Sequence, residues 1–365
     1  MSLQLGLVGL PNVGKSTLFN ALTNAGATVA NYPFTTIDPN VGVVPVPDAR
    51  LGRLGAIVKP ERLVPTTLRI VDIAGLVKGA SHGEGLGNQF LSHIRGVDAM
   101  VMVVRCFENL DVAHVTPELD PVEDIETVDL ELVLSDLTIL ERHYEKVQSL
   151  AKANPREHRE EAEVIARAVD ALRAGTAIRD MEFKPEQRSY LAGIPLLTAM
   201  PRLYVANVSE DDLPDGGTYA EQVRIYAQRD GTPTVVLCAK LEAELNELPP
   251  EDASQYLASC GLSRPGLDRM ITTGYGLLRL ITFFTMTGGK EVRAWTLQRG
   301  QTALDAAATV HTDMARGFIR AEVVAFDDLD RLGSIAAARE AGKVRLEGRD
   351  YVVRDGDVIH IRFAV

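Results

Sequence analysis

Apolar residues gather in short segments along the chain, and each segment predicts a strand. The clearest are 3–8, 68–72, 202–206 and 234–237. Apolar runs of this length are typical of buried strands. A helical pattern from Ser16 to Leu22 follows the first of them. Strands that alternate with helices along the chain predict an α/β fold.

Between the second and third strands the apolar pattern changes to a helical period. A first seam has apolar positions three and four residues apart, and a second seam follows a break at 154–155. The seam positions are Leu130, Val133, Leu137, Leu140, Tyr144, Val147 and Ala151, then Ala162, Ile165, Val169 and Leu172. Two such segments predict an antiparallel helical hairpin inserted into the α/β domain. Two ordinary surface helices are the alternative.

The C-terminal segment, 281–365, has a different order of elements. Strands are expected at 291–297, 321–326 and 358–363, with a helix that Thr302 caps and that extends to Val310. This order predicts a β-grasp arrangement, in which a sheet folds around one helix. His311 and Asp313 lie close in sequence without a third catalytic partner, so we expect a binding module.

The composition is that of an ordinary globular protein, with 365 residues of which 46% are hydrophobic and 24% are charged. No apolar run approaches the roughly 20 residues that span a bilayer, and the N-terminus lacks the features of a secretory signal. The three cysteines, Cys106, Cys238 and Cys260, have no metal-ligand spacing. We therefore expect a reduced, cytoplasmic protein with no membrane partner.

The net charge of −12 argues against a surface covered with nucleic-acid-binding residues. The charge is distributed unevenly. Residues 141–190 contain ten Lys/Arg and ten Asp/Glu, and residues 281–365 contain twelve of each. If the protein contacts RNA, these two neutral segments are better candidates than the acidic remainder.

One motif indicates a specific chemistry. The segment Gly9-Leu10-Pro11-Asn12-Val13-Gly14-Lys15-Ser16-Thr17 matches the phosphate-loop pattern G-x-x-x-x-G-K-[ST], and it lies between a predicted strand and a predicted helix. Glycines at 9 and 14 allow backbone N–H groups to point towards phosphates. Lys15 is expected on the β- and γ-phosphates and Ser16 on Mg²⁺. The predicted phosphate-side residues are Asn12, Val13, Gly14, Lys15, Ser16 and Thr17.

Two later segments fit the same chemistry. Asp72 ends the second strand and begins a D-x-x-G motif, which predicts a role for Asp72 at the magnesium and for the Gly75 N–H at the γ-phosphate. Thr35 and Thr36 lie between the two motifs. A threonine there would complete the Mg²⁺ shell only while the γ-phosphate is present, as in a switch loop. The glycine-rich segment 79–87 is interpreted as a second switch.

The residue after Gly75 departs from the pattern of Ras-type GTPases. Those enzymes have a glutamine there that orients the attacking water, whereas this chain has Leu76. Leucine cannot hydrogen-bond, so hydrolysis is expected to be slow or to use another group. His82 and His114 are the nearby candidates.

The base-reading segment also differs from that of Ras-type GTPases. GTPases read guanine with N-K-x-D, but this chain has Asn207-Val208-Ser209-Glu210 and no Asn-Lys dipeptide. Loss of the polar pairing that reads guanine should relax or invert the preference for guanine over adenine. The sequence therefore favours ATP over GTP as the nucleotide. Cys238 and Ala239 resemble the S-A-K loop beside the base. The predicted base-side residues are Asn207, Val208, Glu210, Cys238 and Ala239.

The chain resembles the YchF/Obg-like ATPase family along its whole length. The segments that carry the resemblance are 9–16, 31–39, 72–87, 207–210 and 311–322. The resemblance implies an α/β fold with a Ras-like P-loop NTPase domain, an inserted coiled-coil hairpin and a C-terminal β-grasp (TGS) domain. The corresponding predicted boundaries are 1–128 with 200–280, 129–199 and 281–365.

The resemblance also implies ligands and roles. It implies ATP or ADP as ligand, Mg²⁺ as cofactor, a ribosome or other RNA as partner, and a role in translation or stress. It points to His114 as the catalytic histidine and to Thr36 as the magnesium threonine. Asn12 is in the position that would favour a K⁺ ion. We expect a monomer.

The leading hypothesis is therefore a slow, Mg²⁺-dependent ATPase switch. A GTPase in which Glu210 substitutes for aspartate is one alternative. A non-catalytic, ATP-sensing RNA-binding adaptor is the other: Leu76 favours it, and the intact Lys15, Ser16 and Asp72 argue against it.

Overall fold

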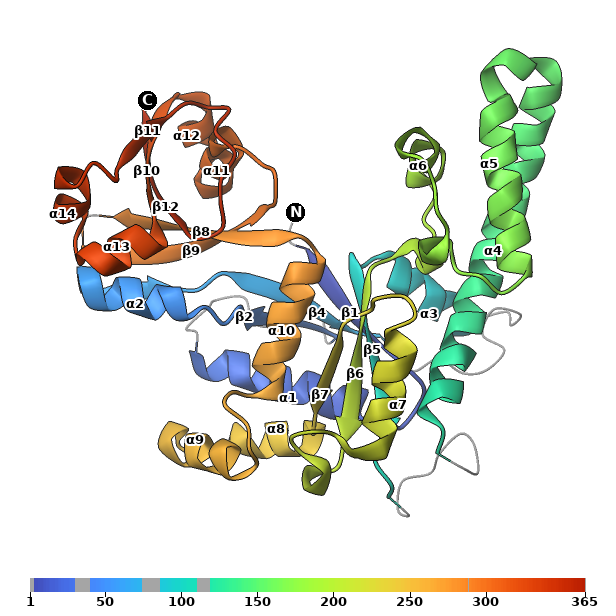
Figure 1. Cartoon of the computed structure of the whole chain (residues 1–365), viewed down its shortest axis with the longest axis horizontal. Coiled ribbons are helices and arrows are strands. Elements are labelled where there is room, and N and C mark those ends of the chain that lie inside the picture. Colours follow the sequence, from blue (N-terminus) through green and yellow to red (C-terminus); the bar gives the residue numbers. More distant parts are fainter. Residues whose placement is uncertain (1–2, 30–39, 74–85, 110–118, 288, 365) are drawn as a thin grey trace. The chain divides into compact units, whose positions relative to one another are not determined.

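The computed structural model describes residues 3–29, 40–73, 86–109, 119–287 and 289–364 (Figure 1). The chain folds into two compact units. The first comprises residues 1–42 and 69–270, and the second comprises 43–68 and 271–365. Among the described helices, none is long and apolar enough to cross a membrane.

The first unit is built on a six-stranded sheet, in which the strand order is β2-β4-β1-β5-β6-β7. Strands β4, β1, β5, β6 and β7 are parallel, whereas the edge strand β2 runs antiparallel to β4. All eight residues of β5 and all seven of β6 are buried, which is typical of interior strands of a parallel sheet. The predicted strands at 3–8, 68–72, 202–206 and 234–237 are confirmed. The strands are β2 (Val41–Pro45), β4 (Thr67–Asp72), β1 (Gln4–Val8), β5 (Ala99–Cys106), β6 (Arg202–Val208) and β7 (Thr234–Leu237).

Helices connect these strands. The first, α1 (Lys15–Val29), begins directly after the glycine-rich loop, so the predicted helix from Ser16 is confirmed. It packs against α8 (Ala239–Leu245). The remaining helices of this unit outside the hairpin are α3 (Leu86–Arg95), α7 (Gly217–Ala227), α9 (Pro250–Ser259) and α10 (Gly266–Leu277), the last of which continues into the second unit.

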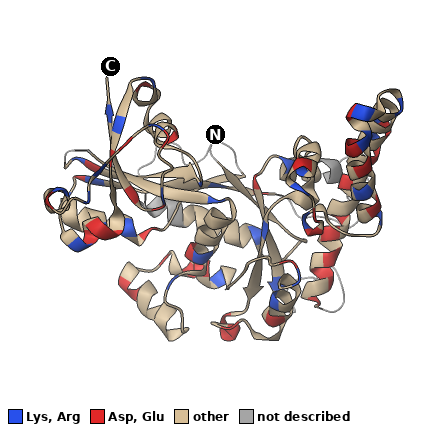
Figure 2. Ribbon diagram, turned by 45° about the horizontal axis from the view of Figure 1, so that its top comes forward, with Lys and Arg blue, Asp and Glu red and all other residues tan. Residues whose placement is uncertain are grey.

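The predicted helical hairpin is formed by α4 (Pro121–Ala153) and α5 (Pro155–Arg173), which are followed by α6 (Pro185–Ala192). Acidic and basic residues are intermixed along the hairpin (Figure 2). The buried residues between its helices include Val133, Leu140, Ile165, Ala168, Val169 and Leu172. They confirm the two seams from Val133 onward.

The prediction that Leu130 is the first seam position was wrong. Leu130 is 53% exposed, although the heptad spacing places it in the seam. The reason is that α4 begins at Pro121, well before the seam, and its early turns bury a different face, with Ile125, Val128 and Leu132. That part of α4 packs against β5 and α7 instead of α5.

The second unit contains a mixed sheet, in which the strand order is β11-β10-β12-β8-β9-β3. Parallel β8 and β12 lie at its centre, and α11 (Ala303–Val310) packs on one face with a core that includes Phe283, Ala306 and Ile359. This is the predicted β-grasp arrangement. The strands are β11 (Arg345–Glu347), β10 (Phe318–Ala325), β12 (Asp357–Phe363), β8 (Leu280–Thr287), β9 (Glu291–Gln298) and β3 (Arg62–Val64).

Most local predictions for this unit hold. Thr302 caps α11 and forms a capping box with Asp305. The strand expected at 321–326 begins earlier, at Phe318, and it ends at Ala325 because Phe326 starts α13. The short helices of the unit are α12 (Thr312–Arg316), α13 (Phe326–Leu332) and α14 (Ile335–Glu340).

Residues 43–68 differ from expectation. The sequence motifs place them in the nucleotide-binding domain, but they pack with the C-terminal segment. Strand β3 pairs with β9 in parallel, from Arg62 opposite Glu291 to Val64 opposite Arg293. Helix α2 (Ala49–Val58) buries Leu51 and Leu54 in a second core of the same unit.

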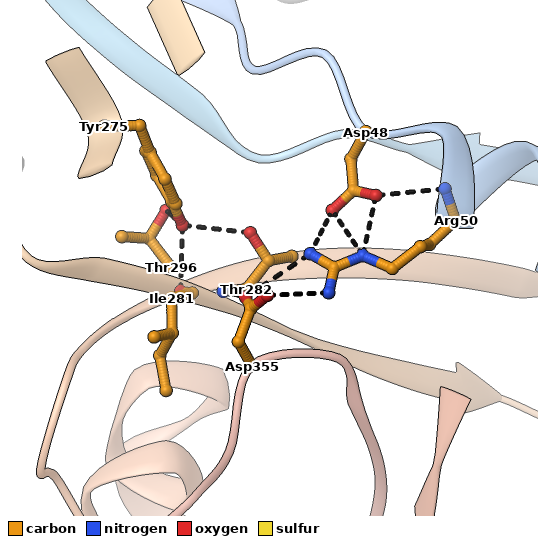
Figure 3. Close-up of polar contacts among 7 residues, drawn as sticks. All are labelled: Asp48, Arg50, Tyr275, Ile281, Thr282, Thr296 and Asp355. Atoms are coloured by element: carbon orange, nitrogen blue, oxygen red, sulfur yellow. Dashed lines mark hydrogen bonds and ion pairs between the residues drawn. The ribbon is translucent and has the colours of Figure 1, made fainter. Parts of the chain in front are cut away.

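A polar network fixes α2 to that unit (Figure 3). The Arg50 guanidinium contacts Asp48 at 2.7 Å and Asp355 at 2.8 Å, and it lies over the Phe284 ring. Asp355 also accepts a hydrogen bond from the Thr282 N–H at 2.8 Å. Beside it, the Tyr275 hydroxyl contacts the Ile281 carbonyl and the hydroxyls of Thr282 and Thr296.

Candidate functional site

The candidate site lies where the parallel strands of the first unit end. Gly9 follows β1, Asp72 ends β4, Asn207 lies near the end of β6 and Cys238 follows β7. Ligands of open α/β sheets bind outside the carboxyl ends of the strands. The topology therefore brings the phosphate-side and base-side segments predicted from the sequence to one edge of the sheet.

The loop between β1 and α1 has a backbone that favours glycine. Gly9 has φ +153° and Gly14 has φ +96°, and Asn12 adopts φ +62° in the left-handed region. A Cβ on Gly9 would clash with the Val103 carbonyl oxygen on β5. Asn12 within the loop and Thr17 in the first turn of α1 are exposed, whereas Val13 is buried. The two glycines thus let the loop turn tightly over the sheet and direct N–H groups at a ligand.

Lys15 is enclosed by this loop and is only 7% exposed. Its Nζ donates to the carbonyl oxygens of Gly9 at 2.9 Å and Leu10 at 2.6 Å. Burial lowers the pKa of Lys15 to about 8, although the Asp72 carboxylate opposes this change. A cation held at the centre of the loop is suited to the oxygens of a bound polyphosphate.

Asp72 and Ser16 lie next to Lys15. Burial raises the pKa of Asp72, while the Lys15 charge and a hydrogen bond with the Ser16 hydroxyl act in the opposite direction. A hydroxyl and a carboxylate are the hard oxygen ligands that Mg²⁺ prefers. In the part of the chain that the structure describes, no group of three or more His, Cys, Asp or Glu could hold a metal alone. The Ser16 hydroxyl and the Asp72 carboxylate fit an Mg²⁺ ion that shares its shell with phosphate oxygens and water.

Asn207 connects the phosphate loop to the base-side loop. Its Nδ2 donates to the Val13 carbonyl at 2.9 Å, and its Oδ1 accepts from the Ala239 N–H at 2.9 Å. Ala239 begins α8, and the preceding Cys238 is buried. Burial raises the pKa of the Cys238 thiol, so this cysteine is a packing residue of the loop and not a reactive one.

Glu210 begins a short 3₁₀ helix, η3 (Glu210–Asp212), which is separated from the buried Val208 at the end of β6 by Ser209 alone. Its Oε1 accepts a hydrogen bond from the Tyr256 hydroxyl on α9. This carboxylate raises the pKa of Tyr256 to about 12. Sequence reasoning missed Tyr256, because it belongs to no motif and lies far along the chain from Glu210.

Several predicted residues lie outside the described residues: Thr35, Thr36, Gly75, Leu76, His82 and His114. Their roles stay predictions. The described chain does reach the start of the segment that contains His114. There, buried Arg105 donates to the carbonyl oxygens of Phe107 and Asn109, both at 3.1 Å. Arg105 is a second residue that the motifs did not indicate.

A strand, a glycine-bounded loop that encloses a lysine, and a helix that begins with Lys-Ser define the class: a P-loop nucleoside triphosphatase of the α/β type. Comparisons with known proteins agree. Residues 4–136 match a family model described as "50S ribosome-binding GTPase", and residues 280–364 match the model YchF-GTPase_C, described as "Protein of unknown function (DUF933)".

Full-length relatives narrow the class to a family. The chain is 51% identical to "Ribosome-binding ATPase YchF" of Bacillus subtilis and 48% identical to the protein of that name in Escherichia coli O157:H7, with all of each chain covered. A solved structure of the Schizosaccharomyces pombe YchF GTPase is 36% identical, with 99% of this chain and 98% of that chain covered, at a TM-score of 0.90. The chain belongs to the YchF family, and the predicted fold class is confirmed.

Proposed function

We propose that this protein is a cytoplasmic, Mg²⁺-dependent ATPase that acts as a nucleotide-state switch for a ribosome. The observation that carries the proposal is the pairing of a complete phosphate site with a base-side segment that lacks the guanine motif. Lys15, Ser16 and Asp72 lie together in the phosphate site. In the base-side segment, Asn207 is held by backbone groups and Glu210 is held by Tyr256.

In this mechanism the chain binds and orients the triphosphate. Lys15 exchanges its two carbonyl partners for β- and γ-phosphate oxygens and neutralises the charge that develops as the γ-phosphoryl leaves. Ser16 and Asp72 would hold Mg²⁺, together with Thr36, and the ion supplies further positive charge beside the phosphates. The Gly75 N–H would contact the γ-phosphate, and His114 would orient the attacking water that Leu76 cannot. Asn12 would favour a K⁺ ion beside the loop.

The names of relatives support two parts of the proposal. The Bacillus subtilis and Escherichia coli proteins are named ribosome-binding ATPases. The Schizosaccharomyces pombe structure is named a GTPase, which favours GTP as the second candidate nucleotide. Calorimetric affinities for ADP and GDP, with Mg²⁺ present, separate the two. A clear preference for GDP would move the protein to the GTPases without changing the phosphate site.

Hydrolysis and partner binding need their own measurements. We expect slow ATP turnover by the full chain and a marked loss in His114→Ala. Absence of turnover in the parent would favour the non-catalytic RNA-binding adaptor, and undiminished turnover in the variant would exclude the histidine. Ribosome co-sedimentation should differ between ATP and ADP. Deletion of 281–365 is a poor test of the ribosome contact, because α2 and β3 would lose the sheet against which they pack.

A further inference from the structure

We propose that Tyr256 is a positioning residue for nucleotide selectivity: its hydroxyl holds the Glu210 carboxylate in a direction that prevents paired hydrogen bonds to guanine. The inference rests on the proposed function and deepens it, since it names a cause of the ATP preference outside the base-reading segment itself. The two side chains come from elements far apart in sequence, η3 and α9.

The hydrogen bond is placed by a small core of its own. Leu257, the neighbour of Tyr256 on α9, is buried with Cys238, Leu241 and Leu245. Leu213, which directly follows η3, packs partly buried against the same cluster. One apolar cluster therefore holds α9, α8 with the preceding Cys238, and the segment that follows Glu210. Because the elements that carry Tyr256 and Glu210 pack against the same core, their backbones are held so that the two side chains stay within hydrogen-bond reach.

The chemistry of the purine edge explains why that direction matters. Guanine presents two adjacent donors, N1–H and N2–H, which a carboxylate accepts in parallel with both of its oxygens. Adenine presents an acceptor at N1 and a donor at N6, so a carboxylate that faces N1 receives no hydrogen bond from it. The Tyr256 hydroxyl donates to Oε1 of Glu210. Although a carboxylate oxygen can accept a second hydrogen bond, an Oε1 that is already engaged by Tyr256 is less available for the parallel pair that guanine requires.

Asn207 does not compensate for a diverted Glu210. Its amide oxygen and nitrogen are each engaged by backbone groups, those of Ala239 and Val13. Guanine would thus meet a Glu210 carboxylate that another side chain already engages. Unmade hydrogen bonds to a polar base edge are the strongest source of discrimination between similar ligands.

The test is Tyr256→Phe in the full chain, with ADP and GDP affinities measured by calorimetry in the presence of Mg²⁺. We expect GDP affinity to rise about tenfold, the effect of one hydrogen bond to a charged group, and ADP affinity to stay within about twofold. An ADP-to-GDP ratio equal to that of the parent would overturn the inference. Tyr190→Phe is the matched control, since it removes a hydroxyl that contacts Glu160 at 3.5 Å in the helical hairpin.

A second variant tests whether Tyr256 acts through Glu210. In a Glu210→Ala background, Tyr256→Phe should leave the ratio of ADP affinity to GDP affinity unchanged. A rise in GDP affinity in that background would show that the hydroxyl excludes guanine by itself, and it would overturn the positioning role. Different results would contradict the proposed function and the inference about Tyr256. A parent that prefers GDP contradicts the ATP assignment, whereas a parent that prefers ADP with an unchanged ratio in Tyr256→Phe contradicts only this inference.

Discussion

The side-chain amide of Asn207 occupies the space that a Cβ on Gly14 would need. Because Asn207 Nδ2 also donates to the Val13 carbonyl at 2.9 Å, it cannot withdraw without loss of that bond. The second glycine of the phosphate loop is thus required for two reasons: its φ of +96° and the approach of a residue from β6. An asparagine that GTPases use beside the base here also braces the phosphate loop.

Gly14→Ala should therefore damage nucleotide binding. The methyl group must displace Asn207 or the loop, so we expect ADP affinity to fall by at least about tenfold, which is roughly 1.4 kcal/mol. Calorimetry measures the loss. Gly52→Ala on α2 is the control, since a Cβ there meets nothing within 4 Å. If Gly14→Ala binds ADP as tightly as the parent, the loop accommodates the methyl group despite its contact with Asn207.

The buried Lys15 predicts a pH dependence of ADP binding. Its pKa is lowered to about 8, and only the charged amine attracts phosphate. The charged fraction falls from most of the molecules at pH 7 to about a tenth at pH 9, so ADP affinity should fall roughly tenfold across that window. Lys15→Gln should bind more weakly but without this dependence. An equal fall in both proteins would assign the titration to another group.

Local patterns revealed the elements that local chemistry determines. The phosphate loop was identified because its glycines and lysine are adjacent in sequence, and the hairpin because its seams repeat every few residues. Leu130 was misassigned since spacing alone cannot show that the first turns of α4 face β5 and α7. A period identifies a helix face, but the partner of that face is a tertiary property.

Long-range contacts explain the other omissions. The pairing of β3 with β9 joins residues whose sequence separation exceeds two hundred, and no motif reports it. The Tyr256–Glu210 hydrogen bond is similar, because an exposed tyrosine on a short helix has no distinguishing neighbours in sequence. Both omissions concern how separate segments meet, which hydrophobic and polar patterns constrain only weakly.

Buried Glu242 on α8 predicts a pH dependence of stability. Burial raises its pKa to about 7 from an ordinary value of 4.5, although the Gly266 N–H donates to it at 2.5 Å. Between those two pH values the folded state binds more protons than the unfolded state, so stability falls as pH rises through the window. Glu242→Gln keeps an acceptor and removes the charge.

The free energy of unfolding of Glu242→Gln, relative to the parent, should therefore increase by roughly 3 kcal/mol between pH 4.5 and pH 8. Urea unfolding followed by circular dichroism at both pH values gives this difference. Glu244→Gln, an exposed change on the same helix, is the control and should show little change. A Gln variant that loses stability at pH 8 would mean that the charge of Glu242 is needed.

The contacts of Arg50 predict how much the attachment of α2 to the rest of the second unit contributes to stability. It contacts Asp48, Asp355 and the Phe284 ring with a side chain that is 28% exposed, so Arg50→Ala should lower the free energy of unfolding by about 1–2 kcal/mol. Arg53→Ala on the same helix removes an ion pair whose arginine is 64% exposed, and it should cost less than about 0.5 kcal/mol. The fluorescence of the single tryptophan, Trp295 on β9, reports unfolding of this unit. Equal losses in the two variants would show that the Arg50 network is no stronger than a surface ion pair.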